Sequence, residues 1–220
     1  MQRKGEWGSV AGQRNPTSSF QPDTVVFDLG GVLLGWEPAV LFEPLLANGV
    51  DVATFLAETD FSNWNLEHDR GVPWSEAAAD VRRRAPRHEP VFRQYPERFQ
   101  DALVGEIPGT QVVLTALRAA GVRILGLTNF GRDNFEVARQ VHPWLDELDG
   151  IVVSSHEGLV KPDPALYQVL LDRYQVIAGR AVFIDDRPEN VVTARELGFV
   201  GIDFVSAEQL AAELSELGLL

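Results

Sequence analysis

The chain reads Thr24-Val25-Val26-Phe27-Asp28-Leu29-Gly30-Gly31 near its N-terminus. The first four of these residues are apolar or β-branched, a pattern that is typical of a short buried strand. The two glycines then permit a tight turn, so the strand is expected to end at Asp28. The pattern therefore places a carboxylate at the carboxyl end of a strand, where backbone groups of the turn can approach a ligand closely.

From Gly109 onward, strand-like and helix-like segments alternate along the chain. Helices are predicted over residues 110–120, 133–141, 164–174, 189–197 and 207–217, and strands over residues 122–127, 151–154, 181–184 and 199–204. Alternation at this spacing indicates a parallel sheet that is covered by helices on both faces. We therefore predict an α/β fold whose ligands bind at the carboxyl ends of the strands.

Residues 35–108 show a different pattern. Helical periodicity runs through this segment, which contains Trp36, Trp64 and Trp74 and no convincing strand. We call residues 35–108 the helical block, and we assign residues 23–34 and 109–220 to a sheet-forming core. Because the helical block follows the first strand end directly, it should lie over the same edge of the sheet as Asp28.

Composition excludes several classes of protein. The chain has 220 residues, of which 45% are hydrophobic and 23% charged, as expected for one folded domain with an insertion. The formal net charge of -13 argues against a nucleic-acid-binding surface, and the absence of cysteine excludes thiol nucleophiles and cysteine-based metal sites. No apolar run is long enough to span a membrane, and residues 1–22 are polar, which predicts a flexible extension rather than a signal peptide. We expect a cytoplasmic monomer or homodimer.

Polar side chains follow three of the predicted strands, namely Asp28, Thr128-Asn129 and Asp185-Asp186. Three carboxylates that meet at one edge of a sheet repel one another, and a hard cation resolves this repulsion. Mg²⁺ fits, because it accepts few protein carboxylates and often bridges to a substrate phosphate. The backbone carbonyl of Gly30 could complete the ligand set. A structural alternative stays open for Asp185, which could instead cap the helix that follows it.

The same edge also offers groups that can bind an anion. The Thr128 hydroxyl, the Asn129 amide and the ammonium of Lys161 are all potential donors to a phosphoryl oxygen. Lysine is scarce in this chain, which uses arginine for nearly all of its 19 basic residues. A metal site, a free carboxylate and a set of phosphate donors together indicate phosphoryl transfer through an aspartyl-phosphate.

Four segments of the sequence resemble, in order, the four motifs of the haloacid dehalogenase superfamily. They are residues 25–33 (Val-Val-Phe-Asp-Leu-Gly-Gly-Val-Leu), residues 125–129 (Leu-Gly-Leu-Thr-Asn), residues 160–164 (Val-Lys-Pro-Asp-Pro) with Tyr167, and residues 183–190 (Phe-Ile-Asp-Asp-Arg-Pro-Glu-Asn). The resemblance extends over residues 24 to 205. It is strongest to small phosphatases related to the N-terminal domain of soluble epoxide hydrolase and to bacterial sugar-phosphate phosphatases.

The resemblance implies a Rossmann-like three-layer core with an inserted helical cap. It also implies roles for individual residues. Asp28 would be the nucleophile and a metal ligand, and the other ligands of Mg²⁺ would be the Gly30 carbonyl, Asp186 and Asp185. Thr128 and Lys161 would act in catalysis and, with Asn129, would bind the phosphoryl group. In the helical block, His68-Asp69-Arg70-Gly71 matches a loop that contributes to substrate choice, so Arg70 is a candidate for substrate binding.

One position departs from the pattern of the superfamily. Many members carry a second aspartate two residues after the nucleophile, where it acts as general acid and base, but this chain has Gly30 there. Protonation of the leaving group would then fall to water, to another residue, or to a substrate with a good leaving group.

Four functions remain as alternatives. The leading hypothesis is a Mg²⁺-dependent phosphatase that acts on a small phosphorylated metabolite. A haloacid-type dehalogenase needs no metal, and the paired acids Asp185-Asp186 argue against it. The glycine at position 30 raises the possibility of a weak or non-catalytic phosphate-binding scaffold, although Asp28, Lys161 and Asp186 are all retained. A phosphotransferase is a fourth possibility, but such enzymes depend on the acid and base that Gly30 replaces.

Overall fold

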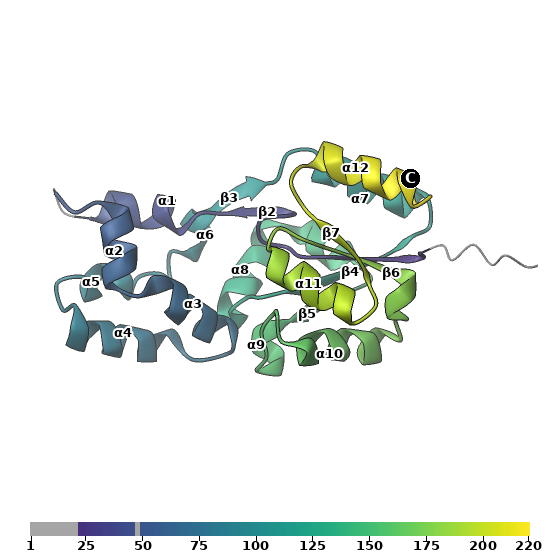
Figure 1. Ribbon diagram of the computed structural model, residues 1–220. Helices are drawn as coiled ribbons and strands as arrows, with labels where there is room; N and C mark the ends of the chain where they lie inside the picture. Colours follow the sequence, from purple (N-terminus) through teal and green to yellow (C-terminus); the bar gives the residue numbers. More distant parts are fainter. Residues whose placement is uncertain (1–21, 47–48) are drawn as a thin grey trace, which may run out of the picture.

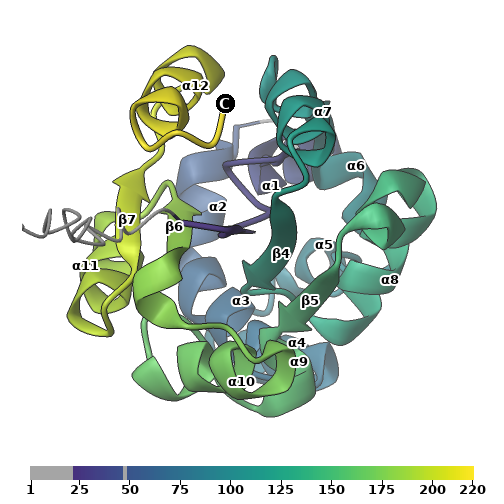
Figure 2. The ribbon, with the colours of Figure 1, turned by 90° about the vertical axis from the view of Figure 1, so that its right-hand side faces the viewer.

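A five-stranded parallel sheet forms the centre of the molecule (Figures 1 and 2). The structure is a computed structural model that describes residues 22–46 and 49–220. In spatial order the strands are β5 (Gly150–Val153), β4 (Arg123–Thr128), β1 (Thr24–Phe27), β6 (Ala181–Asp185) and β7 (Val200–Asp203). Every neighbouring pair is parallel. The predicted α/β fold with a Rossmann-like sheet is confirmed, and β1 lies at its centre as an entirely buried strand.

Helices cover both faces of this sheet, as Figure 2 shows. They are α7 (Thr110–Ala119), α8 (Arg132–Val141), α9 (Ser154–Glu157), α10 (Pro164–Tyr174), α11 (Pro188–Glu196) and α12 (Ala207–Glu216), with short 3-10 turns at Pro143–Glu147 and Ala178–Arg180. Successive side chains of a strand point to opposite faces. Val25 and Phe27 accordingly pack in the apolar cluster that includes α7, α8 and α12, whereas Val26 packs in the cluster that includes α10 and α11.

The helical block leaves and rejoins the sheet-forming part through a pair of short strands. Strands β2 (Leu34–Trp36) and β3 (Leu103–Glu106) pair in antiparallel orientation, with Gly35 opposite Gly105. The prediction that residues 35–108 contain no strand was therefore wrong. Each strand has only three or four residues and includes a glycine, so neither shows the alternation that marks a strand in a sequence. Their pairing depends on bringing together distant segments, which local periodicity does not report.

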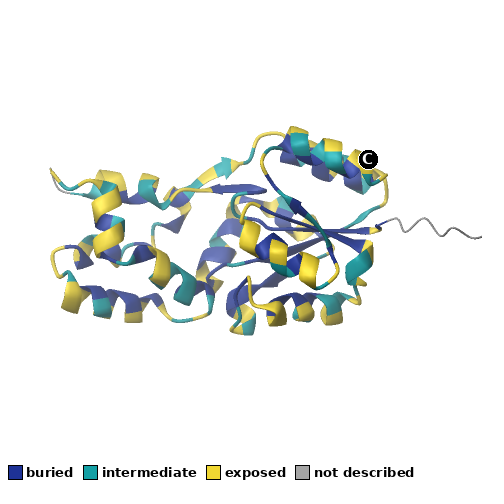
Figure 3. Cartoon of the chain, viewed as in Figure 1, coloured by how far each residue is buried: buried dark blue, intermediate teal, exposed yellow. Residues whose placement is uncertain are grey.

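Between β2 and β3 lie the helices of the helical block, seen at the left of Figure 1. They are α1 (Pro38–Phe42), α2 (Val52–Glu58), α3 (Phe61–Asp69), α4 (Trp74–Arg84), α5 (Glu89–Phe92) and α6 (Phe99–Ala102), with a 3-10 turn at Glu43–Leu45. Figure 3 shows that buried residues concentrate on the inward-facing sides of the helices and along the central sheet. The division of the chain into a core and an inserted cap stays a prediction.

An aromatic cluster holds the helical block together. The Trp74 ring stacks on Phe92 with 4.7 Å between the ring centroids and lies 4.6 Å from Tyr95. Its indole N–H donates to the backbone carbonyl of Phe92 at 3.2 Å. Trp74 is the first residue of α4 and is buried, while Pro73 occupies the N-cap position. The tryptophan therefore serves packing, and the start of α4 lacks a side-chain cap.

Two expectations concern the environment of the chain. The predicted flexible extension, residues 1–22, lies outside the described residues except for Pro22, which is buried. Among the described residues, no helix has both the length and the apolar character needed to cross a membrane. The cytoplasmic location stays a prediction.

Candidate active site at the end of the parallel sheet

Three carboxylates meet at the carboxyl ends of β1 and β6. The two strands pair in parallel with Phe27 opposite Ile184, so that Asp28 and Asp185 emerge side by side. The Asp28 N–H donates to the Ile184 carbonyl at 2.9 Å and keeps the two strands in register up to this point. Oxygens of Asp28, Asp185 and Asp186 lie within 4.8 Å of one another. The structure thus brings together the acids that the sequence analysis expected at one edge of the sheet.

Asp28 is buried at the centre of this cluster. One carboxylate oxygen accepts a hydrogen bond of 2.7 Å from the Leu29 N–H, and the other lies 2.9 Å from the Lys161 ammonium. The pKa of Asp28 is raised to about 7, mainly by burial; the charge of Lys161 opposes this shift, and the charges of Asp185 and Asp186 contribute to it. The site therefore concentrates negative charge that a cation would stabilise.

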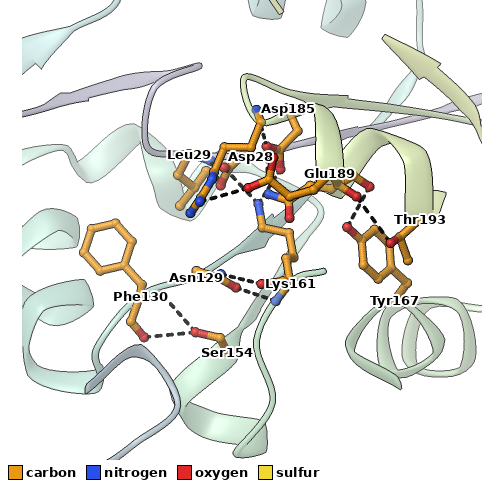
Figure 4. A network of polar contacts seen from close by, with 12 residues as sticks. Asp28, Leu29, Asn129, Phe130, Ser154, Lys161, Tyr167, Asp185, Glu189 and Thr193 are labelled. Atoms are coloured by element: carbon orange, nitrogen blue, oxygen red, sulfur yellow. Dashed lines mark hydrogen bonds and ion pairs between the residues drawn. The ribbon is translucent and has the colours of Figure 1, made fainter. Parts of the chain in front are cut away.

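Lys161 lies between two of the acids (Figure 4). Its ammonium is 2.9 Å from Asp28 and 2.7 Å from Asp185, and only 2% of the residue is exposed. Burial lowers the pKa of this lysine, but the two carboxylates raise it more, so the net pKa is above its ordinary value. Lys161 is consequently a buried cationic donor directed at the nucleophile candidate.

The loop that carries Lys161 is held by Asn129. The Lys161 N–H donates to the Asn129 side-chain oxygen at 2.8 Å, and the Asn129 amide donates back to the Lys161 carbonyl at 3.1 Å. These reciprocal bonds appear as the paired dashed lines in Figure 4. Asn129 thus positions the lysine, and its side chain also lines the cavity described below.

Asp185 and Asp186 differ in their surroundings. Asp185 is fully buried: one oxygen pairs with Lys161, and the other accepts from the Arg187 N–H and the Asn190 amide, each at 2.9 Å. Asp185 thus holds the N-cap residue and the Asn190 side chain of α11 (Pro188–Glu196), although no side chain caps the first turn of this helix within the described part of the chain. Asp186 is exposed as a residue, but the partial desolvation of its carboxylate, together with the Asp185 charge, raises its pKa.

Gly31 makes room for Asp186. Its backbone has a φ of +76°, and a Cβ at this position would lie 2.4 Å from an Asp186 oxygen. Both the left-handed backbone and the close approach require glycine. The turn predicted from the two glycines is therefore tied to the position of a carboxylate in the cluster.

Thr128 ends β4 with its hydroxyl unused. The residue is 1% exposed, and its Oγ1 has no hydrogen-bond partner within the part of the chain that the structure describes. Buried hydroxyls are usually hydrogen-bonded, so this one is available to a ligand.

Arg70 lies apart from these residues. It follows α3 as its C-cap residue, its side chain is 38% exposed, and its guanidinium forms an ion pair with Glu67 at 3.5 Å. Among the described residues it does not line the cavity near Asp28. Its predicted role in substrate binding stays a prediction.

A cavity of about 70 Å³ extends from the turn after Asp28 to the helical block. Aromatic and amide side chains form most of its wall, and the lining residues are Gly30, Trp36, Asn65, Asp69, Tyr95, Phe99, Asn129, Phe130 and Asn134. A Cβ placed on Gly30 would meet no atom within 4 Å, so the glycine leaves open space on the site side of the cavity. Residues of the helical block and of the sheet-forming part thus enclose one space.

Asp69 is a titratable residue of this cavity to which the sequence analysis assigned no role of its own. It ends α3, is buried, and accepts a hydrogen bond of 3.0 Å from the Asn65 amide. The pKa of Asp69 is raised to about 8, and burial is the largest cause. The Asp28 charge also raises this pKa, whereas a hydrogen bond from the Gly131 N–H and the charge of Lys161 lower it. Its place in the His68-Asp69-Arg70-Gly71 loop was noted, but no local signal distinguishes it from an exposed helix-end acid.

The family described as haloacid dehalogenase-like hydrolase matches residues 22–198. The chain belongs to this family. This haloacid dehalogenase-like hydrolase is 30% identical over 204 residues to the sesquiterpene phosphatase astK of Aspergillus oryzae, and the match covers 87% of the chain and 94% of that protein.

Two solved structures show the same fold. A HAD-like family hydrolase of Porphyromonas gingivalis has a TM-score of 0.72 at 22% identity, covering 90% of this hydrolase and 98% of that chain. The HAD family enzyme bt-2542 of Bacteroides thetaiotaomicron, solved in complex with magnesium and inorganic phosphate, has a TM-score of 0.60 at 17% identity, covering 84% and 95%.

Proposed function

We propose that this hydrolase is a Mg²⁺-dependent phosphomonoester phosphatase that acts on a small phosphorylated metabolite through an aspartyl-phosphate on Asp28. The observation that carries the proposal is the position of Asp28. This carboxylate lies at the end of the central strand, with a second and third acid within 4.8 Å and a buried lysine 2.9 Å away. A nucleophile beside a metal-binding set and a fixed cation is what phosphoryl transfer requires.

The residues at this edge fit Mg²⁺. All candidate ligands are oxygens, which hard cations prefer, and the raised pKa values of Asp28 and Asp186 reflect burial and the repulsion among neighbouring carboxylates, both of which a bound cation would offset. Asp28, Asp186 and the Gly30 carbonyl would hold the ion. Asp185 would contribute through a water molecule, because both of its oxygens already accept hydrogen bonds. When bound, the ion would neutralise charge and polarise the phosphoryl group.

The protein groups would perform the following chemistry. A carboxylate oxygen of Asp28 attacks phosphorus, and the bond from phosphorus to the leaving oxygen breaks. The Lys161 ammonium and the free Thr128 hydroxyl bind the phosphoryl oxygens during this step, with Asn129 holding the lysine loop in place. Water then attacks phosphorus, the bond to Asp28 breaks, and inorganic phosphate is released.

The site is compatible with the overall charge of the chain. A formal net charge of -13 would repel a phosphate ester at long range. At the site itself, Lys161 and a bound divalent cation would face the substrate, so attraction is local. The relatives support the proposal in that one is named a phosphatase and one structure holds magnesium and phosphate.

The dehalogenase and the non-catalytic scaffold are weaker alternatives. A dehalogenase reaction has no use for a metal, whereas three carboxylates converge here. A binding scaffold would not need the nucleophile candidate to be paired with a buried lysine at 2.9 Å.

The test is phosphate release from 4-nitrophenyl phosphate with Mg²⁺ and with EDTA. The parent should require Mg²⁺, and Asp28→Asn should lose activity on the order of 10⁴-fold or more. Asp203→Asn is a matched control, because Asp203 ends β7 in register with Asp185 but pairs with Arg195 at the surface. Equal activity of parent and Asp28→Asn, or fluoride release from fluoroacetate without any phosphate release, would refute the proposal.

The residues that line the cavity indicate which substrates should be tested after 4-nitrophenyl phosphate. Its rings favour a leaving group with apolar surface, and the sesquiterpene phosphatase is a relative. Isoprenyl and aryl monophosphates should therefore be compared with sugar phosphates.

A further inference from the structure

We propose that Asp69 is the general acid and base of this reaction, in place of the carboxylate that is absent at Gly30. The inference rests on the proposed phosphatase function. It assigns to the helical block a residue that takes part in the chemistry, whereas the nucleophile belongs to the sheet.

The backbone of Asp69 is fixed against the core. The Ser154 hydroxyl donates a hydrogen bond of 2.6 Å to the Asp69 carbonyl and accepts one of 2.8 Å from the Phe130 N–H. Phe130 directly follows Thr128-Asn129, so Ser154 joins the end of α3 to the loop that carries the phosphate-donor candidates. Figure 4 shows Ser154 and Phe130 beside Asn129 and Lys161.

The side chain of Asp69 is held from the other direction by a chain of hydrogen bonds. The Asn65 amide donates to an Asp69 oxygen at 3.0 Å, and the Asn65 oxygen accepts from the Tyr95 hydroxyl at 3.0 Å. The Trp36 indole N–H donates to the Tyr95 oxygen at 3.2 Å. Such a supported carboxyl keeps one orientation, which a group that transfers protons needs.

Asp69 borders the space that a leaving group would occupy. Asp69 and Gly30 line the same cavity, and Gly30 is two residues from Asp28. A phosphoryl group on Asp28 would direct its ester oxygen away from the nucleophile, which is the in-line geometry of phosphoryl transfer. The empty space at Gly30 and the carboxyl of Asp69 lie at the cavity that receives that oxygen.

The protonation of Asp69 suits the role. Burial raises its pKa to about 8, so the carboxyl carries a proton at neutral pH. The charged and titratable groups that act on it or lie beside it are Asp28, Lys161, Tyr95 and the preceding His68. The Nδ1 atom of His68 contacts the Val72 carbonyl at 3.0 Å, and Asn65 is the side chain that donates to Asp69.

The two steps balance as follows. In the first step the bond between Asp28 and phosphorus forms, the ester bond breaks, and the leaving oxygen takes the electron pair and the proton of Asp69. In the second step the Asp69 carboxylate accepts a proton from the attacking water as the oxygen–phosphorus bond forms. The bond from phosphorus to Asp28 then breaks, which releases phosphate and restores both acids to their initial states.

The experiment compares Asp69→Asn with the parent on an alkyl phosphate and on 4-nitrophenyl phosphate. For each substrate, kcat/KM reports the steps up to departure of the leaving group. An alkoxide leaves poorly without a proton, so kcat/KM on the alkyl phosphate should fall by about 10²-fold or more. On the aryl phosphate it should fall less than about fivefold, which also shows that the variant is folded. The parent's loss of alkyl phosphate activity at high pH should be absent from the variant.

A rescue variant makes the test specific. Gly30→Asp meets no steric obstacle and places a carboxylate beside the same space. Added to Asp69→Asn, it should restore alkyl phosphate activity by about tenfold or more. Asp80→Asn is the control, because Asp80 belongs to the same helical block, pairs with Arg83 and Arg84 and, among the described residues, does not line the cavity, so it should leave the alkyl-to-aryl ratio unchanged.

Three outcomes overturn the inference. If Asp69→Asn lowers kcat/KM equally on both substrates, or if Asp69→Glu and Gly30→Asp fail to restore the alkyl phosphate activity, Asp69 has only a structural role. If the parent itself releases no phosphate, the proposed function fails together with this inference. An active parent with a uniform loss in the variant overturns the inference alone.

Discussion

The Ser154 hydroxyl donates a hydrogen bond of 2.6 Å to the backbone carbonyl of Asp69, a residue 85 positions earlier in the chain. The same oxygen accepts from the Phe130 N–H, so a single buried side chain satisfies one donor and one acceptor of the backbone. The two backbone groups belong to the helical block and to the core respectively. Ser154 thus connects the two parts of the molecule next to the candidate site.

Ser154→Ala should destabilise the protein and weaken its activity. The change leaves the Asp69 carbonyl and the Phe130 N–H without their partner, which costs about 1–3 kcal/mol of the free energy of unfolding. Alkyl phosphate activity should fall about tenfold as Asp69 loses its support. Ser155→Ala is the control, since the Ser155 hydroxyl has no hydrogen-bond partner among the described residues. Urea denaturation and kcat/KM measure both effects; equal stability of the two variants would contradict the prediction.

Replacing Lys161 should unfold the site as well as inactivate it. Lys161→Met leaves the buried carboxylates of Asp28 and Asp185 without their cation, and breaking such a pair costs about 3–5 kcal/mol. Arg180→Met removes an exposed cation that pairs with Asp23, so it should cost less than about 1 kcal/mol. Chemical denaturation in EDTA compares the two. A similar small loss in both variants would show that the buried pairs contribute little.

Gly31→Ala should weaken metal binding. The added Cβ meets the Asp186 carboxylate and is strained at a φ of +76°. The Mg²⁺ concentration for half-maximal activity should rise about tenfold or more. Gly121→Ala introduces the same strain, at a φ of +74°, but its Cβ meets nothing within 4 Å. That control should lose stability without any change in Mg²⁺ dependence, and a change in both variants would argue against a role of Gly31 at the metal site.

Asp69 should make the protein less stable as pH rises. Its folded-state pKa of about 8 lies above the ordinary value of 3.8. Between pH 3.8 and pH 8 the folded state therefore holds a proton that the unfolded state has already lost. The stabilisation is complete below pH 4 and is lost as pH rises towards 8. Asp69→Asn removes this dependence, and the difference is on the order of a few kcal/mol, since one pKa unit corresponds to about 1.4 kcal/mol.

Urea denaturation at pH 5 and at pH 8 measures this effect. The loss of stability between the two pH values should be smaller in Asp69→Asn than in the parent. Identical losses in both proteins would mean that Asp69 titrates normally.

Much of the fold follows from local patterns in the sequence. The helix over Pro164–Tyr174 was predicted with the observed bounds, and the strands of the central sheet were predicted to within two residues. Buried parallel strands are continuous apolar runs, and Gly121 and Gly198 mark the ends of two helices, so both kinds of element are visible locally. β2 and β3 could not be predicted from local patterns, because short strands that contain glycine owe their pairing to the tertiary structure.

The candidate site likewise contains residues whose position the sequence predicts and residues whose position it does not. The meeting of Asp28 with Asp185 follows from a general property of parallel sheets, whose strand ends share one edge. The position of Asp69 depends on how α3 packs against Ser154 and Phe130, and on a chain of side chains that runs through Tyr95 to Trp36. Contacts between segments so far apart leave no periodic or compositional trace in the sequence. A burial-induced pKa shift is likewise a property of the folded structure alone.

The antiparallel pair β2 and β3 has a mechanical consequence. Within residues 22–46 and 49–220, the chain enters and leaves the helical block through β2 and β3, which are hydrogen-bonded to each other as one ribbon. A paired ribbon behaves as a single hinge, so bending there would swing the whole helical block while the central sheet stays intact. Such a swing would part Ser154 from Asp69 and carry the proton donor away from Asp28. Opening the enzyme to admit substrate and switching off its chemistry would then be the same movement.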